Sequence, residues 1–405
     1  MRIRSVTIFA GPDIWRLEAE LPRAGALAAE ARRRLIALGY EVQTTRLALP
    51  PLHDWAAGRP LGEITAKARK LDAEAAGLGI DYVSLGPLNP QHDGGLMGTL
   101  PQLFAETQRL FTSAFITSGH SVLSGALPQI ARAVLEIARS TENGFGNLRF
   151  AALASCGPHI PFFPAAYASG RGDFSFALAL EAADLALDAC RNATSCTHAM
   201  LTLRSAIESH SQKIEPVLQA LAKETAANFC GFDWSLAPHP DPARSIVAAI
   251  EALSGAPLGG NGSLSAVAML TSAIRSADVR HTGFSGVFLP VLEDALLAQR
   301  ADEKSCDLSR LLLYSSVCGA GLDTIPLPGD VSAEAIAALL ADVASLSIIL
   351  HKPLTARLMP VPGLKPGQRT AFDFPYLVNA QPLELAGRAP GLLRDASIEL
   401  RPREP

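Results

Sequence analysis

The sequence has few aromatic residues and few charges, and it lacks a long, uniformly apolar run. Aromatic side chains make up 6% of the 405 residues and charged ones 18%, whereas 48% are hydrophobic. The core must therefore be aliphatic and rich in alanine, which suits helices packed closely on a sheet. The longest uncharged window, residues 110–131, contains a histidine, a proline, glycines and serines. A membrane span is more apolar than this, so we expect no membrane partner.

Basic stretches and paired cysteines are also missing. The net charge is -4 and no basic stripe carries interleaved aromatic residues, so nucleic acid is not an expected partner. The six cysteines are scattered and form no CxxC pair, which predicts reduced thiols in the cytoplasm. The first apolar run is too short for a signal peptide and is interpreted as a strand. We therefore expect a cytoplasmic protein.

Strand-like and helix-like segments alternate through the chain without an internal repeat or a low-complexity linker. This alternation predicts a largely parallel α/β sheet in a single domain spanning residues 1–405. Residues 174–191 are predicted to be helical. Strands are predicted at residues 6–10, 41–48, 82–85, 113–117, 150–154, 233–236, 284–289, 357–360 and 376–379.

Polar residues follow several of these predicted strands. His120, His159 and Glu293 each stand shortly after a strand. Ligands of parallel α/β sheets bind at the carboxyl ends of the strands, so these three residues are candidates for one site. Glu293 and its neighbour Asp294 fit the acidic first turn of a helix equally well, because negative side chains are favoured there.

The stretch from residue 311 to residue 330, LLLYSSVCGAGLDTIPLPGD, is the most unusual part of the chain. A strand that contains Gly319 and Gly321 must bend sharply or pack against another backbone. Cys318 lies at this bend. Cysteine is often buried for packing alone, whereas a nucleophilic thiolate needs a nearby cation or base. His120 and His159 are the candidates for that base.

Two carboxylates flank the second half of the same stretch. Asp323 and Asp330 are suited either to a hard divalent metal or to general acid–base catalysis. Asp330 also fits the cap of the helix that follows, because aspartate is a preferred capping residue. The cofactor is unknown at this point, and a divalent metal is left open.

A glycine-rich loop, GGNGS at residues 259–263, precedes a predicted helix. Free backbone N–H groups at such a position bind anions, so Gly260, Gly262 and Ser263 are candidate substrate ligands. The loop matches neither the phosphate-binding lysine motif nor the dinucleotide fingerprint.

Several long motifs in a fixed order resemble the DUF711 family, also called UPF0210. The chain carries IRSVTIF, PFFPAAY, DWSLAP, GGNGSLS, GFSGVFLPVLED, VCGAGLDTIPLPGD, RLMPVPGLKPG and DFPYLVNAQPL. The resemblance covers most of the chain and is strongest over residues 232–382.

The resemblance implies a fold of the pyruvate formate-lyase type, which is shared with the large chain of ribonucleotide reductase. That fold is a ten-stranded α/β barrel with a central loop inside it, and in those enzymes the loop carries a radical-forming cysteine. By this likeness residues 317–321 are expected to be the loop. The Arg-Val-x-Gly-Tyr type segment of glycyl-radical enzymes is missing from residues 373–405, so radical chemistry by that route is not expected.

Together these patterns predict an enzyme that acts on a small anionic metabolite inside a barrel. Its predicted catalytic residues are Cys318, Asp323, His120 and His159, and its predicted substrate ligands are Gly260, Gly262, Ser263, Glu293 and Asp330. The alternative is a metabolite-binding or regulatory protein without catalysis. A homo-oligomer is left open.

Overall fold

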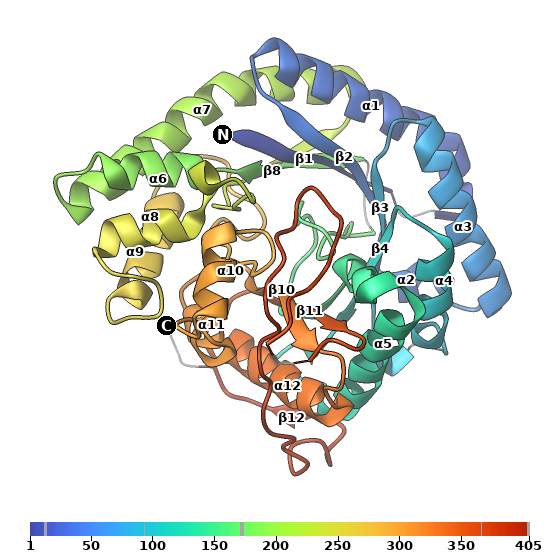
Figure 1. Ribbon diagram of the computed structural model, residues 1–405. Helices are drawn as coiled ribbons and strands as arrows, with labels where there is room; N and C mark the ends of the chain where they lie inside the picture. The colour runs from blue at the N-terminus through green and yellow to red at the C-terminus, as the bar shows by residue number, and fades with distance from the viewer. Residues whose placement is uncertain (12–13, 93, 171–173, 366, 403–405) are drawn as a thin grey trace.

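The strands of the computed structural model form one curved, mostly parallel sheet with helices on its outer side (Figure 1). Residues 1–11, 14–92, 94–170, 174–365 and 367–402 are described. The sheet has nine strands in the order β10-β11-β7-β4-β3-β2-β1-β8-β9. Their bounds are β1 Arg2–Phe9, β2 Val42–Ala48, β3 Tyr82–Leu88, β4 Leu110–Phe115, β7 Phe150–Ala154, β8 Ser175–Glu181, β9 Asn228–Asp233, β10 Gly321–Pro328 and β11 Leu354–Val361.

The strands β1, β2, β3, β4 and β7 run parallel to one another in a continuous block. The pairs β8–β9 and β10–β11 are also parallel. They join the block through antiparallel pairings, β1 with β8 and β7 with β11. A separate small sheet has the order β12-β6-β5 (β5 Thr117–Ser118, β6 Ser121–Val122, β12 Ile398–Glu399). The predicted mixed α/β class with a largely parallel sheet is therefore confirmed.

Helices pack on the outer face of the sheet and bury its apolar side chains. On β1, Ile3, Val6 and Ile8 belong to the main hydrophobic core. Alternating side chains of a strand point to opposite faces, so Ser5 and Thr7 point to the inner face. The helices are α1 Leu17–Ala37, α2 Leu52–Ala56, α3 Leu61–Gly77, α4 Leu100–Glu106, α5 Leu127–Ser140, α6 Ala183–Arg191, α7 Cys196–Thr225, α8 Ile246–Ser254, α9 Ser263–Arg275, α10 Ala295–Asp302, α11 Leu308–Tyr314 and α12 Ala333–Ile349.

An irregular loop between β7 and β8 lies against the inner face of the sheet. All of its residues from 160 to 168 are buried. The Thr7 hydroxyl donates to the Pro161 carbonyl at 2.8 Å, and the Ser84 hydroxyl donates to the Ala166 carbonyl at 2.7 Å. Buried backbone carbonyls require such donors, and polar side chains on the inner face of β1 and β3 supply them.

The expected central loop at residues 317–321 is a different feature in the structure. Residues 308–314 form helix α11, so the first part of the stretch is helical and the predicted bent strand begins only at Gly321. Residues 315–320 make the turn between them. The prediction of close backbone packing is confirmed, because a Cβ on Gly319 would lie 3.0 Å from the backbone of Gly286.

Four other predictions of secondary structure are wrong, and the first is the strand at residues 233–236, because β9 ends at Asp233 and only Leu236 beyond it makes isolated bridges. Residues 175–181, predicted to be helical, form strand β8, which is buried along its whole length between β1 and β9. A strand buried on both faces lacks alternating polarity, so its alanines and leucines imitate a helix. Residues 284–289 make only isolated bridges, and residues 376–379 are a loop.

The sheet does not close by regular pairing of its two edge strands, β9 and β10. The segment 281–290 lies between these two strands. Isolated parallel bridges connect it on one side to β9 and the residues that follow β9, and on the other side to β10. They pair Phe232 with His281, Leu236 with Val287 and Pro290 with Asp323. The predicted barrel of ten strands is therefore present only as a nine-stranded sheet with a bridged gap.

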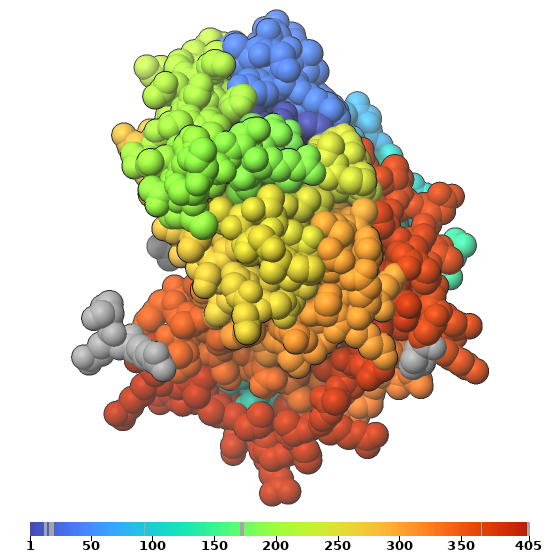
Figure 2. Space-filling model, turned by 60° about the vertical axis from the view of Figure 1, so that its left-hand side comes forward, coloured from blue at the N-terminus to red at the C-terminus, as the bar shows by residue number. Residues whose placement is uncertain are grey.

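The C-terminal part of the chain crosses the concave side of the sheet. We call residues 367–384 the roof segment. In Figure 1 the red chain passes over the middle of the ring of strands, and in Figure 2 red residues cover one flank and the lower end of the surface. The Val378 amide donates to the Leu292 carbonyl at 2.7 Å, and the Leu383 amide donates to the Pro326 carbonyl at 2.8 Å. These bonds hold the segment against the mouth of the sheet.

Candidate active site

A small cavity of about 70 Å³ lies on the inner face of the sheet, under the roof segment. Strands, the loop between β7 and β8, and the roof segment all contribute to its wall. Its lining residues are Arg4, Gln43, Arg46, Tyr82, Phe111, Leu148, Ala151, Phe162, Phe163, Pro164, Ala165, Ala237, Phe284, Phe288, Glu293, Ala320, Asp323, Thr355, Arg357, Phe374, Tyr376 and Leu377.

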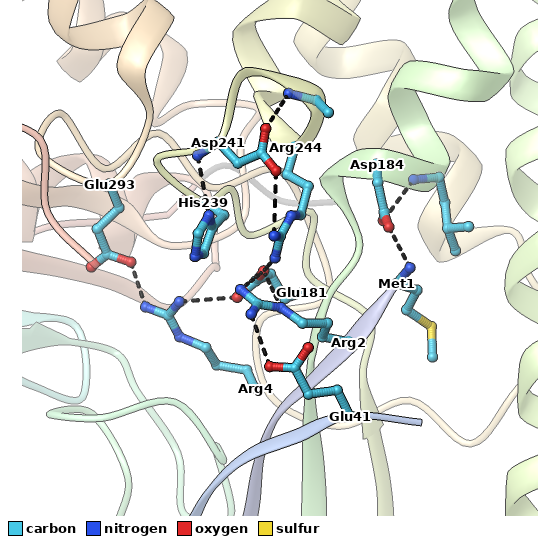
Figure 3. A network of polar contacts seen from close by, with 12 residues as sticks. Met1, Arg2, Arg4, Glu41, Glu181, Asp184, His239, Asp241, Arg244 and Glu293 are labelled. Atoms are coloured by element: carbon cyan, nitrogen blue, oxygen red, sulfur yellow. Dashed lines mark hydrogen bonds and ion pairs between the residues drawn. The ribbon is translucent and has the colours of Figure 1, made fainter. Parts of the chain in front are cut away.

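One end of the cavity is formed by a chain of alternating charges, which we call the ionic network. The Arg357 guanidinium contacts Asp323 through Nε at 2.6 Å and Glu293 through Nη2 at 2.9 Å. Arg4 contacts the other oxygen of Glu293 and, at 3.2 Å, Glu181. Arg357, Glu293 and Asp323 are each less than 8% exposed, so the charges are shielded from water by the protein. Figure 3 shows Arg4 between Glu181 and Glu293.

Irregular strand pairing brings these side chains into the cavity. Between Ile3 and Ser5 the register of β1 against β8 shifts, so that Arg4 is an extra residue. A bulge of this kind turns a side chain in a new direction. The same happens on β10, where Asp323 and Thr324 together oppose the single residue Arg357 of β11.

Thr324 shows the cost of the second bulge. Its φ is 42°, a left-handed conformation that β-branched residues avoid. Such backbone strain costs roughly 1–3 kcal/mol and is concentrated at functional sites. Thr324 directly follows Asp323 in the same bulge. The bulge that directs the Asp323 carboxylate into the cavity therefore also contains the strained residue.

Burial disfavours every charge in the ionic network, but opposite charges outweigh it for three of the groups. The pKa values of Arg4 and Arg357 are raised despite burial, because carboxylates contact both guanidinium groups. The pKa of Glu293 is lowered despite burial by Arg4 and Arg357. Asp323 differs, since burial raises its pKa and Glu293 adds to the shift, although Arg357 opposes it. Of the two carboxylates that contact Arg357, only Asp323 has a raised pKa.

The network continues from the cavity toward the surface through Glu181. This carboxylate is 2% exposed and is approached by three arginines. Arg2 reaches it at 2.6 Å, Arg4 at 3.2 Å and Arg244 at 3.5 Å (Figure 3). Arg2 also contacts the exposed Glu41 at 3.0 Å. The cations at this end of the cavity are thus matched by carboxylates.

Arg46 of β2 also lines the cavity, close enough to Arg4, Arg357 and Glu293 to interact with them electrostatically. Its Nε donates to the Thr44 hydroxyl at 2.9 Å. Within the described ranges no carboxylate pairs with it, and its two terminal nitrogens make no hydrogen bond. The guanidinium lies over the rings of Tyr82 and Phe163, at 5.7 and 5.2 Å from their centroids. Aromatic faces attract a cation but do not neutralise it.

Arg46 remains charged at neutral pH even though it is only 6% exposed. Burial, together with the positive charge of Arg4, lowers its pKa to about 9. Arginine presents a planar fork of N–H donors that fits a carboxylate or phosphate. Two aromatic rings contact the guanidinium, and its terminal nitrogens have no hydrogen-bond acceptor among the described residues.

A second unsatisfied polar atom lies in the same wall. The amide oxygen of Gln43 is buried and has no hydrogen-bond partner among the described residues. Gln43 also belongs to β2 and lines the cavity. A buried acceptor without a donor is costly, so this amide is available to a polar group of a bound molecule.

Of the predicted site residues, the structure brings Asp323 and Glu293 together in the cavity wall. Cys318 is not among the lining residues. Its side chain is 1% exposed and packs in the main hydrophobic core. Its carbonyl accepts a hydrogen bond from Lys352 Nζ at 2.6 Å, and burial lowers the pKa of that lysine. The structure thus gives Cys318 a position at a helix-to-strand turn, and its catalytic role stays a prediction.

The two predicted histidines do not line the cavity either. His120 is exposed beside the small sheet, with its ring 5.9 Å from that of His351. His159 begins the inner loop with a φ of 67° and its ring contacts Phe9. Burial lowers the pKa of His159. Among the described residues, no hydrogen bond or ring contact joins either histidine to Cys318.

The remaining candidates lie away from the cavity. Gly260 and Gly262 are exposed, and the buried Ser263 hydroxyl accepts a bond from the Gly259 amide at 3.2 Å. Asp330 is exposed and does not cap the next helix, as one interpretation had predicted. The cap is Ser332, whose side chain accepts a hydrogen bond from the Ala335 amide.

Asp294 is a structural carboxylate, in contrast to its neighbour Glu293. It caps α10 by accepting from the Leu296 and Leu297 amides, and it also accepts from Ile246 and Val247 at the start of α8. The helix-start interpretation therefore holds for Asp294, while Glu293 points into the cavity.

In the described ranges, no group of three or more histidine, cysteine, aspartate or glutamate side chains is arranged to hold a metal. The two network carboxylates, Glu293 and Asp323, are instead bound by arginines. Among the helices that the structure describes, none combines the length and the apolarity needed to cross a bilayer.

Fold and cavity define an α/β protein with a buried ionic cavity under a C-terminal roof. A family model described as "Uncharacterised ACR (DUF711)" matches residues 1–376, and the chain belongs to this family. A UPF0210 protein of Pyrobaculum islandicum is 32% identical over 82% of this chain and 76% of its own. One from Pyrobaculum aerophilum is 33% identical over the same shares, and one from Syntrophobacter fumaroxidans is 29% identical over 83% and 78%. The resemblance inferred from the motifs is confirmed.

The sequence interpretation missed the arginines of the cavity. Arg4, Arg46 and Arg357 each stand inside a strand that is otherwise mostly apolar or uncharged. A charged residue in a strand covered on both faces is seldom buried without a partner. That isolation is the signal that could have found them.

Proposed function

We propose that this protein binds a small organic anion in the cavity, with Arg46 as its anchor. The observation that carries the proposal is a buried guanidinium without a counter-ion among the described residues. Beside it, Arg4 and Arg357 are paired with Glu293 and Asp323. The cavity therefore has an excess positive charge, and an uncompensated buried charge is strongly unfavourable.

The arrangement favours binding as the primary function, because Cys318, the nucleophile predicted from the sequence, is not in the wall. The lining residues of the cavity include neither cysteine, serine, lysine nor histidine. This supports the metabolite-binding or regulatory hypothesis over one built on Cys318.

Enzymatic proton transfer is the second candidate function, and Asp323 is the reason. A buried carboxylate with a raised pKa near a bound substrate is suited to act as a general acid or base. Arg357, 2.6 Å away, holds this carboxylate in position. In such an enzyme Asp323→Asn would remove turnover while leaving anion binding within about threefold, whereas a binding protein has no turnover to lose.

We also propose that the segment 281–290 completes the sheet into a closed barrel within one domain. Support comes from the three parallel bridges and from two backbone bonds, Leu236 N to Gly286 O at 2.9 Å and Gly319 N to Val287 O at 2.7 Å. Arg4, near the N-terminus, and Tyr376, near the C-terminus, line the same cavity. This is expected if the chain forms a single domain. Amides of this segment that exchange as fast as those of exposed loops would contradict closure.

The binding proposal is tested by thermal shift with matched anions and neutral amides. Acetate, butyrate and phosphate are compared with acetamide and butyramide. A ligand at 100 times its Kd stabilises by about 2.7 kcal/mol, which is readily detected. We expect at least one anion to stabilise the protein and the neutral amides to have no effect.

Two variants make the test specific to the site. Arg46→Met should abolish the stabilisation by the anion, and Arg204→Met, on the exposed face of α7, should retain it. Equal responses of Arg46→Met and the natural protein would refute the proposal. Arg46→Lys keeps the charge but loses the planar fork, so we expect it to weaken binding by at least tenfold without abolishing it.

A further inference from the structure

The charges that face the cavity restrict the charge of the ligand. Arg4 and Arg357 are balanced by Glu293 and Asp323, so Arg46 contributes one unmatched positive charge. A ligand with one negative charge neutralises it. A second negative charge would be buried near two carboxylates without a counter-ion, which is costly.

Aromatic rings make up a large part of the cavity wall. Aromatic residues are 6% of the chain but eight of the 22 residues in the wall. They stack on one another, as in Phe162 with Phe288 at 4.7 Å and Phe111 with Phe163 at 5.3 Å. These rings belong to two small clusters separate from the main core. The faces of these rings form no conventional hydrogen bonds and favour contact with an apolar ligand body.

The size of the cavity restricts the body further. Each water-sized group needs roughly 10–15 Å³ of cavity volume, so a cavity of about 70 Å³ holds about five heavy atoms. Alanines provide this room, because Ala151 and Ala320 stand where larger residues would fill the space. A short hydrocarbon chain fits, whereas an extended or bulky metabolite does not.

We infer that the ligand is a short-chain monocarboxylate with an apolar body. Its carboxylate would meet the open edge of Arg46, whose faces are covered by the rings of Tyr82 and Phe163. Its body would lie against the aromatic wall. The inference rests on the proposed anion-binding function and narrows it, because it excludes phosphate dianions and dicarboxylates.

Calorimetric titration at pH 7.5 with the straight-chain acids from acetate to hexanoate tests this inference. Succinate, phosphate and butyramide serve as comparisons. Each added methylene should strengthen binding about fourfold, which corresponds to about 0.8 kcal/mol, until the cavity is full. Succinate and phosphate should bind at least tenfold more weakly than butyrate.

The outcomes separate the inference from the function on which it rests. Phosphate or succinate binding as tightly as butyrate, in a manner lost in Arg46→Met, would overturn the inference and leave the anion site standing. An affinity that does not depend on the chain length of the acid would also overturn the inference and leave the anion site standing. If no anion binds, both proposals fail.

Two wall variants test the size limit in opposite directions. Phe288→Leu enlarges the cavity and should move the preferred chain to a longer acid, whereas Ala151→Val narrows it and should move the preference to a shorter one. Phe229→Leu, in the main core, is the matched control and should leave the preference unchanged. If Phe288→Leu does not fold, Ala151→Val decides alone, and an unchanged preference overturns the inference.

Discussion

Two sites in the cavity wall contain the same side chain in opposite situations. Arg357 has a carboxylate on each side, at 2.6 and 2.9 Å. Arg46, in contrast, contacts a hydroxyl and two aromatic rings, and Glu293 acts on it only at longer range. Both guanidinium groups are less than 8% exposed. The two arginines are equally buried, and what separates them is the presence of an ion-paired carboxylate.

The difference also determines what each arginine costs the fold. A buried charge with its partners in place is tolerated, whereas a buried charge without a partner destabilises the folded state. Proteins accept such instability where function requires it. The cavity thus has an ionic network that supports the structure and an Arg46 side chain that the unliganded protein maintains at the expense of stability.

The largest expected effect comes from breaking the ionic network. Arg357→Met should lower the free energy of unfolding by about 3–5 kcal/mol, because Glu293 and Asp323 are left buried without their cation. Urea denaturation measures this change. Adding Asp323→Asn and Glu293→Gln to the same variant should recover much of the loss. A loss below about 1 kcal/mol in the single variant would show that the network carries little of the stability.

The equivalent change at Arg46 should have the opposite sign. Arg46→Met should raise the free energy of unfolding by about 1–4 kcal/mol, since replacement of a buried charge by a packed apolar side chain is often stabilising. Denaturation without added ligand measures it. Arg46→Lys, which retains a charge, is the control and should not stabilise. A destabilised Arg46→Met would mean that Arg46 has a partner that offsets its burial.

Arg46 and the network arginines should also respond differently to pH. Because burial lowers the pKa of Arg46 to about 9, anion affinity should be constant from about pH 7 to 8. Above pH 9 it should fall about tenfold per unit as the guanidinium loses its proton. Arg4 and Arg357 have raised pKa values and stay charged in this range.

The stability of the unliganded protein should change in the other direction. The folded-state pKa of Arg46 lies below its unfolded value, so the unfolded chain binds more protons above pH 9 and this contribution to stability rises with pH. Titrations and denaturation curves from pH 7 to 10.5 measure both trends. Both should be missing in Arg46→Met, and a pH-independent affinity in the natural protein would contradict the assignment of the anchor.

The smallest effect is expected for Cys318→Ser, which lies outside the cavity wall. Anion affinity should be unchanged within twofold, because the sulfur contacts the core and not the cavity. The free energy of unfolding should change by no more than about 1–2 kcal/mol. A large loss of ligand affinity would show that the turn after α11 influences the cavity, and a loss of turnover alone would support the catalytic hypothesis.

Local patterns predicted much of the fold and less of the candidate site. Helix and strand alternation identified the α/β class, and Gly319 was correctly expected to face another backbone. Strand β8 was missed because burial on both faces removes the alternation that marks a strand. Residues 284–289 were overestimated as a strand because their apolar side chains face the interior although the backbone makes only isolated bridges.

Neighbouring residues show the same limit at the level of single side chains. Glu293 and Asp294 are adjacent and chemically alike, yet one lines the cavity and the other caps two helices. Sequence could name both interpretations but could not assign them. Cys318 was favoured for its unusual setting, but Gly319 beside it serves backbone packing against Gly286, and Gly321 serves packing against Thr355.

The sequence by itself determined the family, the α/β class and the places where the backbone must approach closely, because these depend on motifs, periodicity and residue size along the chain. Only the tertiary structure decided which charges meet. Arg4 and Glu293 are 289 residues apart and contact each other in the cavity. The Arg46 side chain, in contrast, finds no carboxylate among the described residues. Whether a buried charge is paired depends on groups that distant segments bring to it, and no local pattern along the chain records that.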